Sequence, residues 1–230
     1  MALVFSNQRL VNNLVKKISQ VERETLDALR DGRVEQEPAL TDRLLGSMEH
    51  VLNGKRVAGV RWTVKTLTDR GRGSQESVFG ADFMAALELS LDGYQVAKGF
   101  LAQSKLIEPS QTFSKQEVTR LKDQCKHMLS FSPASFVFLY SQQSGIVVVP
   151  ATEVLASRDC NPHELTSKKM ASFYRDHFEC FIGDRGIRKT TPQGLDELRQ
   201  RYEAKRLVLL YGSEGDESYD VAQLSLFDQS

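Results

Sequence analysis

Residues 80–106 read GADFMAALELSLDGYQVAKGFLAQSKL, and this stretch decides the fold. Asp92-Gly93 lies between two long apolar runs, and this dipeptide in such a position is the strongest short-range signal of a β-hairpin. The stretch therefore predicts one strand over residues 81–91 and a returning strand over residues 94–106. Antiparallel pairing then brings the beginning of the first strand beside the end of the second.

Polar residues stand at the open end of this predicted hairpin, with Asp82 on the first strand and Gln103 and Lys105 on the second. Side chains alternate along a strand, so Gln103 and Lys105 project from the face that pairing brings beside Asp82. Hard divalent cations such as Mg²⁺ take oxygen ligands, activate water and polarise a phosphodiester, and a nearby ammonium group stabilises the developing charge. The pattern indicates a site for metal-dependent hydrolysis. A structural alternative stays open, in which Asp82 caps a strand and Lys105 is a solvated strand end.

Residues 1–54 have the apolar spacing of helices. Gly32 and Pro38 separate two apolar groups, and Asn53-Gly54 ends the helical part. Residues 57–64 then predict a strand, because they are rich in branched and aromatic side chains. The apolar groups are Leu10, Leu14, Ile18 and Val21, followed by Leu40, Leu44, Leu45, Met48 and Leu52.

The rest of the chain alternates between helical and strand patterns. Ser114, with Glu117 three residues later, forms a capping box and predicts a helix as far as Leu129. Further strands are predicted over residues 135–140, 145–149 and 206–211, and further helices over residues 166–180 and 194–204. This order predicts an α/β fold with a central mixed sheet flanked by helices. A chain of 230 residues suits one domain, divided here into a helical part (1–54), a core with C-terminal helices (55–211) and a tail (212–230).

Gly80-Ala81-Asp82 and Gln103-x-Lys105 resemble the PD-(D/E)xK nuclease superfamily, in its restriction-endonuclease-like branch. The resemblance covers residues 35–149, and residues 178–184 are similar as well. It implies a Mg²⁺-dependent deoxyribonuclease, with Mn²⁺ as a substitute ion. It also implies that Asp82, Gln103 and a glutamate on the preceding helix hold the metal, while Lys105 acts on the attacking water. Glu37 matches the glutamate position best, and Glu35 is close to it.

Gln103 is a departure from the name-giving motif, which has an acid at this position. A neutral amide oxygen binds a cation more weakly than a carboxylate does, because it carries no net charge to attract the ion. The substitution leaves two interpretations: an endonuclease with a weakened metal site, or a protein that keeps the nuclease fold without its activity.

Near its C-terminal end the chain carries a second motif, at residues 223–227. The motif matches the pentapeptide that binds the bacterial DNA polymerase III sliding clamp, and the match implies that all but its serine fill pockets on the clamp. Its residues are Gln223, Leu224, Ser225, Leu226 and Phe227. The acidic stretch 212–220 before it has few apolar residues and predicts a disordered linker. Alternatively, the alternating apolar residues of the motif fold back as an edge strand.

Basic residues are concentrated between residues 55 and 72, although the whole chain has as many acids as bases, 30 of each. Such a stretch suits contacts with the phosphate backbone of DNA, and a solvated strand face explains it equally well. We assign the DNA-binding role to Lys55, Arg56, Arg61, Arg70 and Arg72.

The remaining features bear on location, on zinc and on assembly. Three cysteines, the lack of a secretion signal and the lack of an apolar run of roughly 20 residues predict a cytoplasmic protein, near the nucleoid through the clamp, without a membrane partner. Cys160-x-x-His163 and His177-x-x-Cys180 have zinc-like spacing, but packing in a helix face explains the second pair better than structural Zn²⁺. The N-terminal helices leave a homo-oligomer open.

These features together predict a metal-dependent DNA endonuclease that the sliding clamp recruits to replicating DNA, for defence against phage or plasmid DNA or for DNA repair. The first alternative is a non-catalytic clamp-binding adaptor on a decayed nuclease fold. The second is a zinc-stabilised nucleic-acid-binding module.

Overall fold

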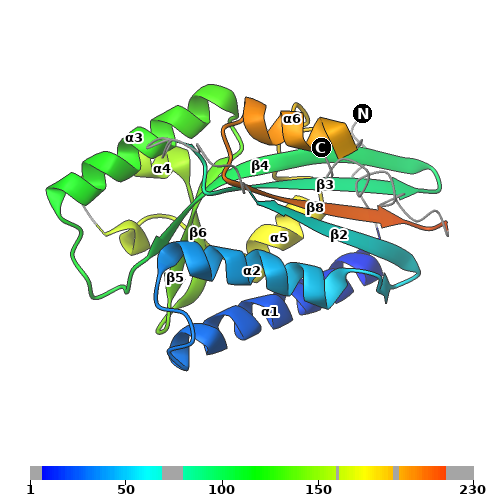
Figure 1. Ribbon diagram of the computed structural model, residues 1–230, viewed down its shortest axis with the longest axis horizontal. Helices are drawn as coiled ribbons and strands as arrows, with labels where there is room; N and C mark the ends of the chain where they lie inside the picture. Colours follow the sequence, from blue (N-terminus) through cyan, green and yellow to red (C-terminus); the bar gives the residue numbers. More distant parts are fainter. Residues whose placement is uncertain (1–6, 69–79, 159–160, 189–191, 216–230) are drawn as a thin grey trace, which may run out of the picture.

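An eight-stranded mixed sheet forms the centre of the protein in the computed structural model, which describes residues 7–68, 80–158, 161–188 and 192–215 (Figure 1). The order of the strands across the sheet is β1-β2-β8-β3-β4-β5-β6-β7. Their bounds are β1 Arg56–Val57, β2 Val60–Thr68, β3 Phe83–Leu91, β4 Tyr94–Leu106, β5 Ser135–Ser141, β6 Gly145–Pro150, β7 Lys168–Lys169 and β8 Arg206–Ser213.

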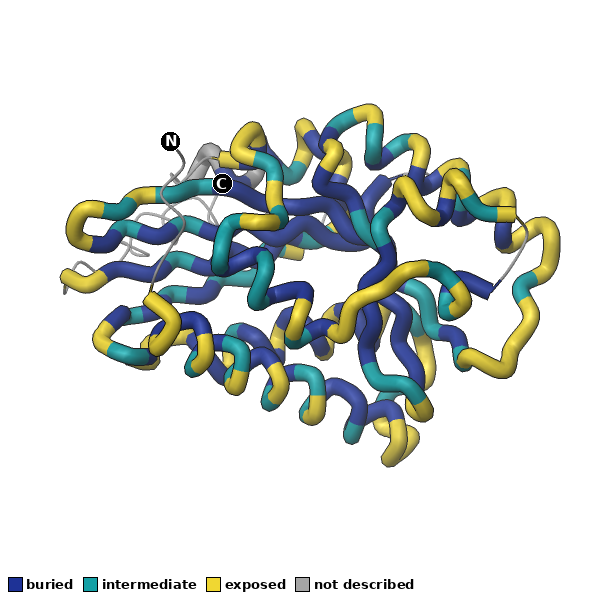
Figure 2. Tube along the Cα trace, turned by 180° about the vertical axis from the view of Figure 1, so that it is seen from behind, coloured by how far each residue is buried: buried dark blue, intermediate teal, exposed yellow. Residues whose placement is uncertain are grey.

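Helices cover both faces of the sheet (Figure 1). One face carries α1 (Gln8–Arg30), α2 (Glu37–Leu52) and α5 (Met170–Phe178), and the other carries α3 (Lys115–Phe131), α4 (Ala151–Ala156) and α6 (Pro192–Arg201). A short 3₁₀ turn spans Pro162–Glu164. Two apolar cores result, one on each side of the sheet, and the central strands are buried on both faces (Figure 2). The predicted α/β class with a central mixed sheet is confirmed.

The predicted hairpin is confirmed as β3 and β4, which are antiparallel from the pair Leu91–Tyr94 to the pair Phe83–Ala102. Gly93 takes a left-handed φ of 68° in the turn, a conformation that glycine adopts without steric cost. The rings of Phe83 and Phe100 meet edge to face on the side of the sheet that α2 and α5 cover.

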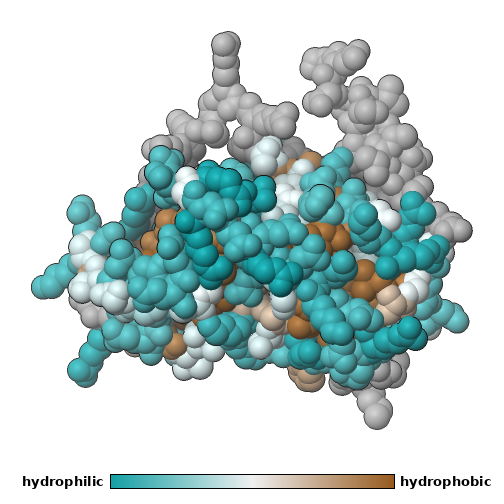
Figure 3. Space-filling view, turned by 90° about the horizontal axis from the view of Figure 1, so that it is seen from below, coloured by the Kyte–Doolittle hydropathy of each residue, from teal (hydrophilic) through white to brown (hydrophobic). Residues whose placement is uncertain are grey.

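The two N-terminal helices and the helix at residue 114 are also confirmed. Ser114 caps α3, and both hydrogen bonds of the predicted capping box with Glu117 are present. The apolar stripe of α1 packs inward, and the outer face of α1 and α2 is mostly hydrophilic with separate apolar areas between the polar groups (Figure 3). The apolar stripe therefore packs within the chain's own core, and the pairing of two chains stays an expectation.

Three sequence expectations about the elements are wrong in part. The strand predicted over residues 57–64 is broken, because Ala58 and Gly59 both have positive φ and form a tight turn between β1 and β2. The helix predicted over residues 166–180 is shorter, because β7 takes its first part. The last strand continues through Ser213, two residues into the predicted tail, because it pairs with β2 along its whole length.

The position of β8 is the main feature of the topology that the sequence did not indicate. It lies between β2 and β3, antiparallel to the first and parallel to the second. The last described strand is therefore central, and its beginning lies beside the beginning of β3. No helix in the described part of the chain is long and apolar enough to span a membrane.

The close packing around Gly99 gives a test of this sheet. Gly99 exchanges two backbone hydrogen bonds with Asp184, and a Cβ atom there would collide with the carbonyl oxygen of Ala85 and the side chain of Ile187. We expect Gly99→Ala to lower the free energy of unfolding by about 1–3 kcal/mol, as overpacking does. Gly46→Ala is the matched control, because nothing lies within 4 Å of its added Cβ in α2 and alanine favours the helix. Urea denaturation measures both, and equal effects would contradict the packing described.

Candidate functional site

Asp82 precedes β3 and is the centre of a polar cluster at one end of the sheet. Its carboxylate oxygen Oδ2 accepts the backbone N–H of Ser104 at 3.0 Å and a hydrogen bond from the side-chain amide of Gln103. The hairpin register produces these contacts, because it places Asp82 opposite Gln103, one position beyond the pair Phe83–Ala102. Asp82 is 7% exposed, so the carboxylate is held in a fixed position near the surface.

Gln103 is almost fully buried, and only one of its two side-chain polar atoms has a hydrogen-bond partner in the described part of the chain. Its Nε2 donates to Asp82, while its Oε1 has no hydrogen-bond partner among the described residues. It is one of seven buried side-chain atoms without a partner in the part of the chain that the structure describes, and such an atom costs about 1–3 kcal/mol; what distinguishes this one is that its amide group contacts a carboxylate. The free Oε1 beside a carboxylate is an oxygen donor for a cation.

Glu37 and Lys105 form the second half of the cluster. Glu37 lies in the first turn of α2; its Oε1 contacts the Lys105 ammonium at 3.2 Å, and its Oε2 accepts the backbone N–H of Leu106 at 3.1 Å. The side chains of Lys105 and Glu37 are 16% and 29% exposed, so solvent reaches the pair. Of the two glutamates that the sequence offered, Glu37 therefore joins the site.

Three hydroxyl groups fix α2 against β4 beneath the cluster. Thr41 donates to the Ser104 hydroxyl at 2.9 Å, and the Tyr140 hydroxyl lies 3.4 Å from Ser104. Burial raises the pKa of Tyr140 to about 12, and the negative charges of Asp82 and Glu37 add to the effect. Tyr140 therefore stays protonated at physiological pH. The hydrogen bond between Thr41 and Ser104 holds the N-terminal part of α2, which includes Glu37, at the end of β4.

Lys205 and Arg206 also belong to the site, and sequence reasoning missed both. The Lys205 ammonium lies 3.2 Å from Asp82 Oδ1. Arg206 pairs with Asp42 of α2 and reaches the backbone oxygens of Pro38 and Asp82 at 3.2 and 3.5 Å. Only the insertion of β8 beside β3 brings these bases here, and no local pattern in the sequence indicates that insertion.

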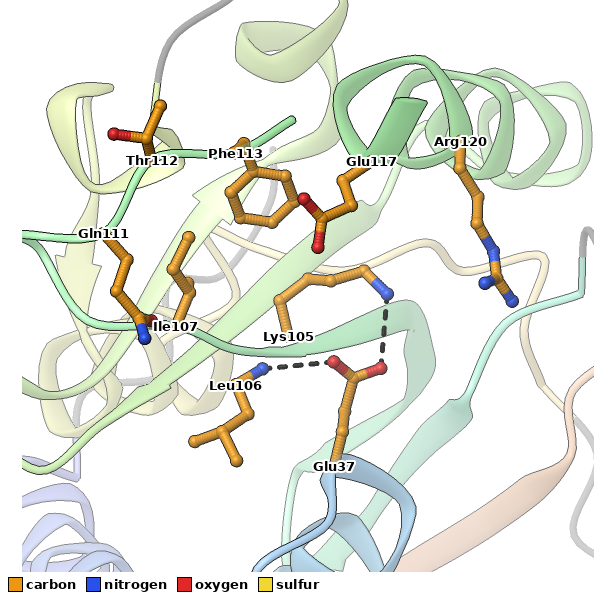
Figure 4. Close-up of a pocket in the computed structure, with 9 residues that line it drawn as sticks. All are labelled: Glu37, Lys105, Leu106, Ile107, Gln111, Thr112, Phe113, Glu117 and Arg120. Atoms are coloured by element: carbon orange, nitrogen blue, oxygen red, sulfur yellow. Dashed lines mark hydrogen bonds and ion pairs between the residues drawn. The ribbon is translucent and has the colours of Figure 1, made fainter. Parts of the chain in front are cut away.

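A pocket of about 580 Å³ opens next to Lys105 (Figure 4). Lys105 and Glu37 form one side of it, and Figure 4 shows Phe113 and the α3 residues Glu117 and Arg120 around the rest. Asp82 and Gln103 do not line this pocket, so the cluster has two parts that share one end of β4. The other lining residues are Leu106, Ile107, Gln111 and Thr112.

The predicted DNA-binding residues lie apart from this cluster, as far as they are described. Arg61 of β2 lies opposite Ser213 of β8, which in turn lies opposite Ser90 of β3. Ser90 is eight residues from Asp82, which corresponds to about 26 Å along the strand. Lys55 and Arg56 are exposed at the same far end, where Arg56 joins two lysines of α1 around a second hollow. Arg70 and Arg72 lie outside the described residues, and so does the whole motif at 223–227.

The residues with zinc-like spacing have other partners. His177 is buried against Phe100 and Tyr174, and burial lowers its pKa to about 3, so it packs as a neutral ring. His163 contacts the backbone oxygen of Ile107 at 2.8 Å, and Cys180 contacts the Tyr94 hydroxyl. Cys160 lies outside the described residues.

The oxygen donors of the site fit a hard divalent cation, although weakly. The described residues contain no group of three or more His, Cys, Asp or Glu side chains placed for a metal. Asp82 and the Gln103 amide are in contact and offer oxygen donors, and ions such as Mg²⁺ complete their shells with water, whereas both oxygens of Glu37 are held by Lys105 and the Leu106 N–H. One carboxylate and one amide predict lower affinity than two carboxylates would give.

Comparisons of the chain with protein-family models, with curated proteins and with solved structures gave no match. The residues of the site and the sequence motifs are therefore the features that indicate a function.

Gln103→Glu tests whether this position faces a cation. Without metal we expect a lower melting temperature, because the donor to Asp82 is lost and two carboxylates face each other; each kcal/mol lost corresponds to roughly 2–4 °C for a chain of this size. With Mn²⁺ we expect the variant to gain more stability than the wild type does, since the ion then binds two carboxylates.

The measurement is thermal unfolding in chelator and in Mn²⁺. Asp82→Asn in the wild-type chain is the companion variant. It has no pair of carboxylates that repel each other and no charged ligand at position 82, so Mn²⁺ should change its melting temperature little. A melting temperature of Gln103→Glu that Mn²⁺ does not restore would argue against a metal at this position.

Proposed function

We propose that this chain is a metal-dependent DNA endonuclease of the PD-(D/E)xK type, which the bacterial sliding clamp recruits to replicating DNA. The observation that carries the proposal is the convergence of Asp82, Gln103, Lys105 and Glu37. They come from the start of β3, the end of β4 and the first turn of α2, and they form two pairs at this end of the sheet: Gln103 donates a hydrogen bond to Asp82, and Lys105 forms an ion pair with Glu37. The α/β architecture with a mixed sheet is compatible with this nuclease fold.

Asp82, Gln103 and Glu37 would hold the metal. Mg²⁺, or Mn²⁺ in its place, would supply an activated water and charge neutralisation on the phosphodiester. The protein's own contribution is geometric and electrostatic. The Ser104 N–H and the Gln103 amide fix the Asp82 carboxylate, and Glu37 holds the Lys105 ammonium where it can orient a water and stabilise negative charge.

The pocket beside Lys105 offers a path for the DNA strand. Its volume is about 580 Å³, and its lining carries two cationic groups that can contact phosphates, Lys105 and Arg120, beside the acids Glu37 and Glu117. The Phe113 ring adds a surface on which a base can stack. A strand in this pocket would pass directly beside the Lys105 ammonium.

The clamp-binding role rests on the sequence motif at residues 223–227, outside the described residues. A tether to the clamp raises the effective concentration of the enzyme at DNA, so weak intrinsic DNA affinity suffices. This arrangement suits replication-linked work, either defence against phage and plasmid DNA or DNA repair.

A second candidate function is a non-catalytic clamp-binding adaptor. The observation that favours it is the ion pair between Lys205 and Asp82, which compensates the carboxylate without any metal. With the neutral Gln103 beside it, the cluster holds together as a purely structural network.

Cleavage of supercoiled plasmid DNA decides between the two functions. We expect the wild type to cut in Mg²⁺ and not in chelator, and we expect Asp82→Ala and Lys105→Ala each to lower the rate at least about 100-fold, the size of a lost electrostatic contribution. Lys168→Ala is the control, because it removes a lysine that is paired with Asp176 outside the site. Full activity in either site variant would refute the assignment, and an inactive wild type would favour the adaptor.

The tail is tested separately by removing residues 223–230. We expect the truncated chain to lose binding to immobilised sliding clamp and to keep the melting temperature of the full chain, because the motif binds as a short linear segment. Within the full chain, replacing both Leu226 and Phe227 by alanine should have the same effect. Ser225→Ala should bind normally, since the serine fills no pocket. Clamp binding by the truncated chain would exclude the tether.

A further inference from the structure

Lys205 stands out because its ammonium pairs with Asp82, the carboxylate that we assign to the metal, whereas Lys105 pairs with Glu37. Its ammonium lies 3.2 Å from Asp82 Oδ1, the oxygen that Gln103 and Ser104 leave free. Its backbone N–H donates to the carbonyl oxygen of Ala81 at 2.9 Å, so its main chain is fixed beside the site. The ammonium therefore occupies the side of Asp82 on which a cation would bind.

The two partners of this ion pair differ in exposure to solvent. The Asp82 side chain is 10% exposed and holds two further hydrogen bonds, whereas the Lys205 side chain is 46% exposed. Only the Lys205 end of the pair is exposed; there solvent screens the ammonium and the long side chain loses entropy in the pair, so the pair gains less stability than a fully buried one would. Lys205 can therefore leave Asp82 at small cost while the carboxylate stays in place.

Gln103 Oε1 gives independent evidence that this arrangement is incomplete. Gln103 is 1% exposed, and with Lys205 on Asp82 its Oε1 has no partner in the described part of the chain. A lysine cannot serve both oxygens as well as a divalent cation with its bound waters, which takes several oxygen ligands at once. Exchange of the ammonium for such an ion would satisfy the buried oxygen and double the charge that faces Asp82.

We propose that Lys205 is an exchangeable counter-ion of the metal site: its ammonium neutralises Asp82 in the metal-free protein, leaves when a divalent cation binds, and then contacts a phosphate of the bound DNA. The inference rests on the proposed nuclease function for its last step only. The first two steps concern the metal and this chain alone. In this role Lys205 balances the charge of Asp82 and takes no part in the reaction itself, while Lys105 remains the residue that orients the attacking water.

Mn²⁺ binding to the full-length protein tests the exchange directly, with free Mn²⁺ measured by electron paramagnetic resonance. We expect Lys205→Met to bind Mn²⁺ about three- to tenfold more tightly than the wild type, because the ion no longer displaces an ammonium group. Lys168→Met is the matched control, since it also removes a lysine from an exposed ion pair, and its affinity should equal that of the wild type. Asp82→Ala should lose this binding.

DNA binding tests the last step. In a Lys105→Ala background, which prevents cleavage, the affinity for a short duplex is measured against salt with Mn²⁺ and with chelator. One phosphate contact contributes about 0.9 to the slope of log affinity against log salt. We expect Lys205→Met to lower the slope by about this amount in Mn²⁺ and to leave it unchanged in chelator.

The outcomes separate this inference from the nuclease proposal. Unchanged or weaker Mn²⁺ binding by Lys205→Met, with an unchanged melting temperature, would overturn the counter-ion role. Tighter Mn²⁺ binding in a protein that cuts no DNA would support the exchange while the nuclease proposal falls. If Asp82→Ala binds Mn²⁺ as the wild type does, the metal is not on this carboxylate and both ideas fall.

Discussion

The register of the β3–β4 hairpin is the constraint on which the candidate site depends. The pair Leu91–Tyr94 at the turn determines every pair as far as Phe83–Ala102, and so places Asp82 opposite Gln103. A slip of one residue would turn each side chain of a strand to the other face. Since β3 and β4 are buried on both faces between two apolar cores, such a slip would misplace the core and the site together. The core therefore enforces the alignment of the polar end.

Two contacts between distant parts of the sequence bring the other charged residues to the site. Thr41 and Ser104 attach the first turn of α2 to β4, and this contact places Glu37 beside Lys105. On the other side, β8 enters the sheet next to β3, and its first residues bring Lys205 and Arg206 to Asp82. Each added charge therefore comes from a segment far away in the sequence, while the hydrogen-bonded pair of Asp82 and Gln103 is local to one hairpin.

This division explains what the sequence could predict. The hairpin and the capping box at Ser114 depend on residues close together in the chain, and both are present as predicted. The convergence of Asp82 with Gln103 followed from strand alternation. The insertion of β8 did not, because an apolar strand pattern shows that a strand is buried but not which neighbours it has. Lys205 was missed for that reason: its sequence neighbourhood resembles any solvated helix-to-strand connection.

The charges of the four site residues balance, and under the proposed function this balance would link metal occupancy to phosphate affinity. Asp82 and Glu37 face Lys205 and Lys105, so the four side chains are neutral together when no metal is bound. Gln103 preserves this neutrality, because an acid at that position would add an unpaired charge beside Asp82. Under the proposed function a divalent cation would turn the same groups into a positive site that attracts a phosphate, and by linkage a bound phosphate would then tighten the hold on the cation. A neutral glutamine in the motif thus favours a site that carries no net charge until a metal binds.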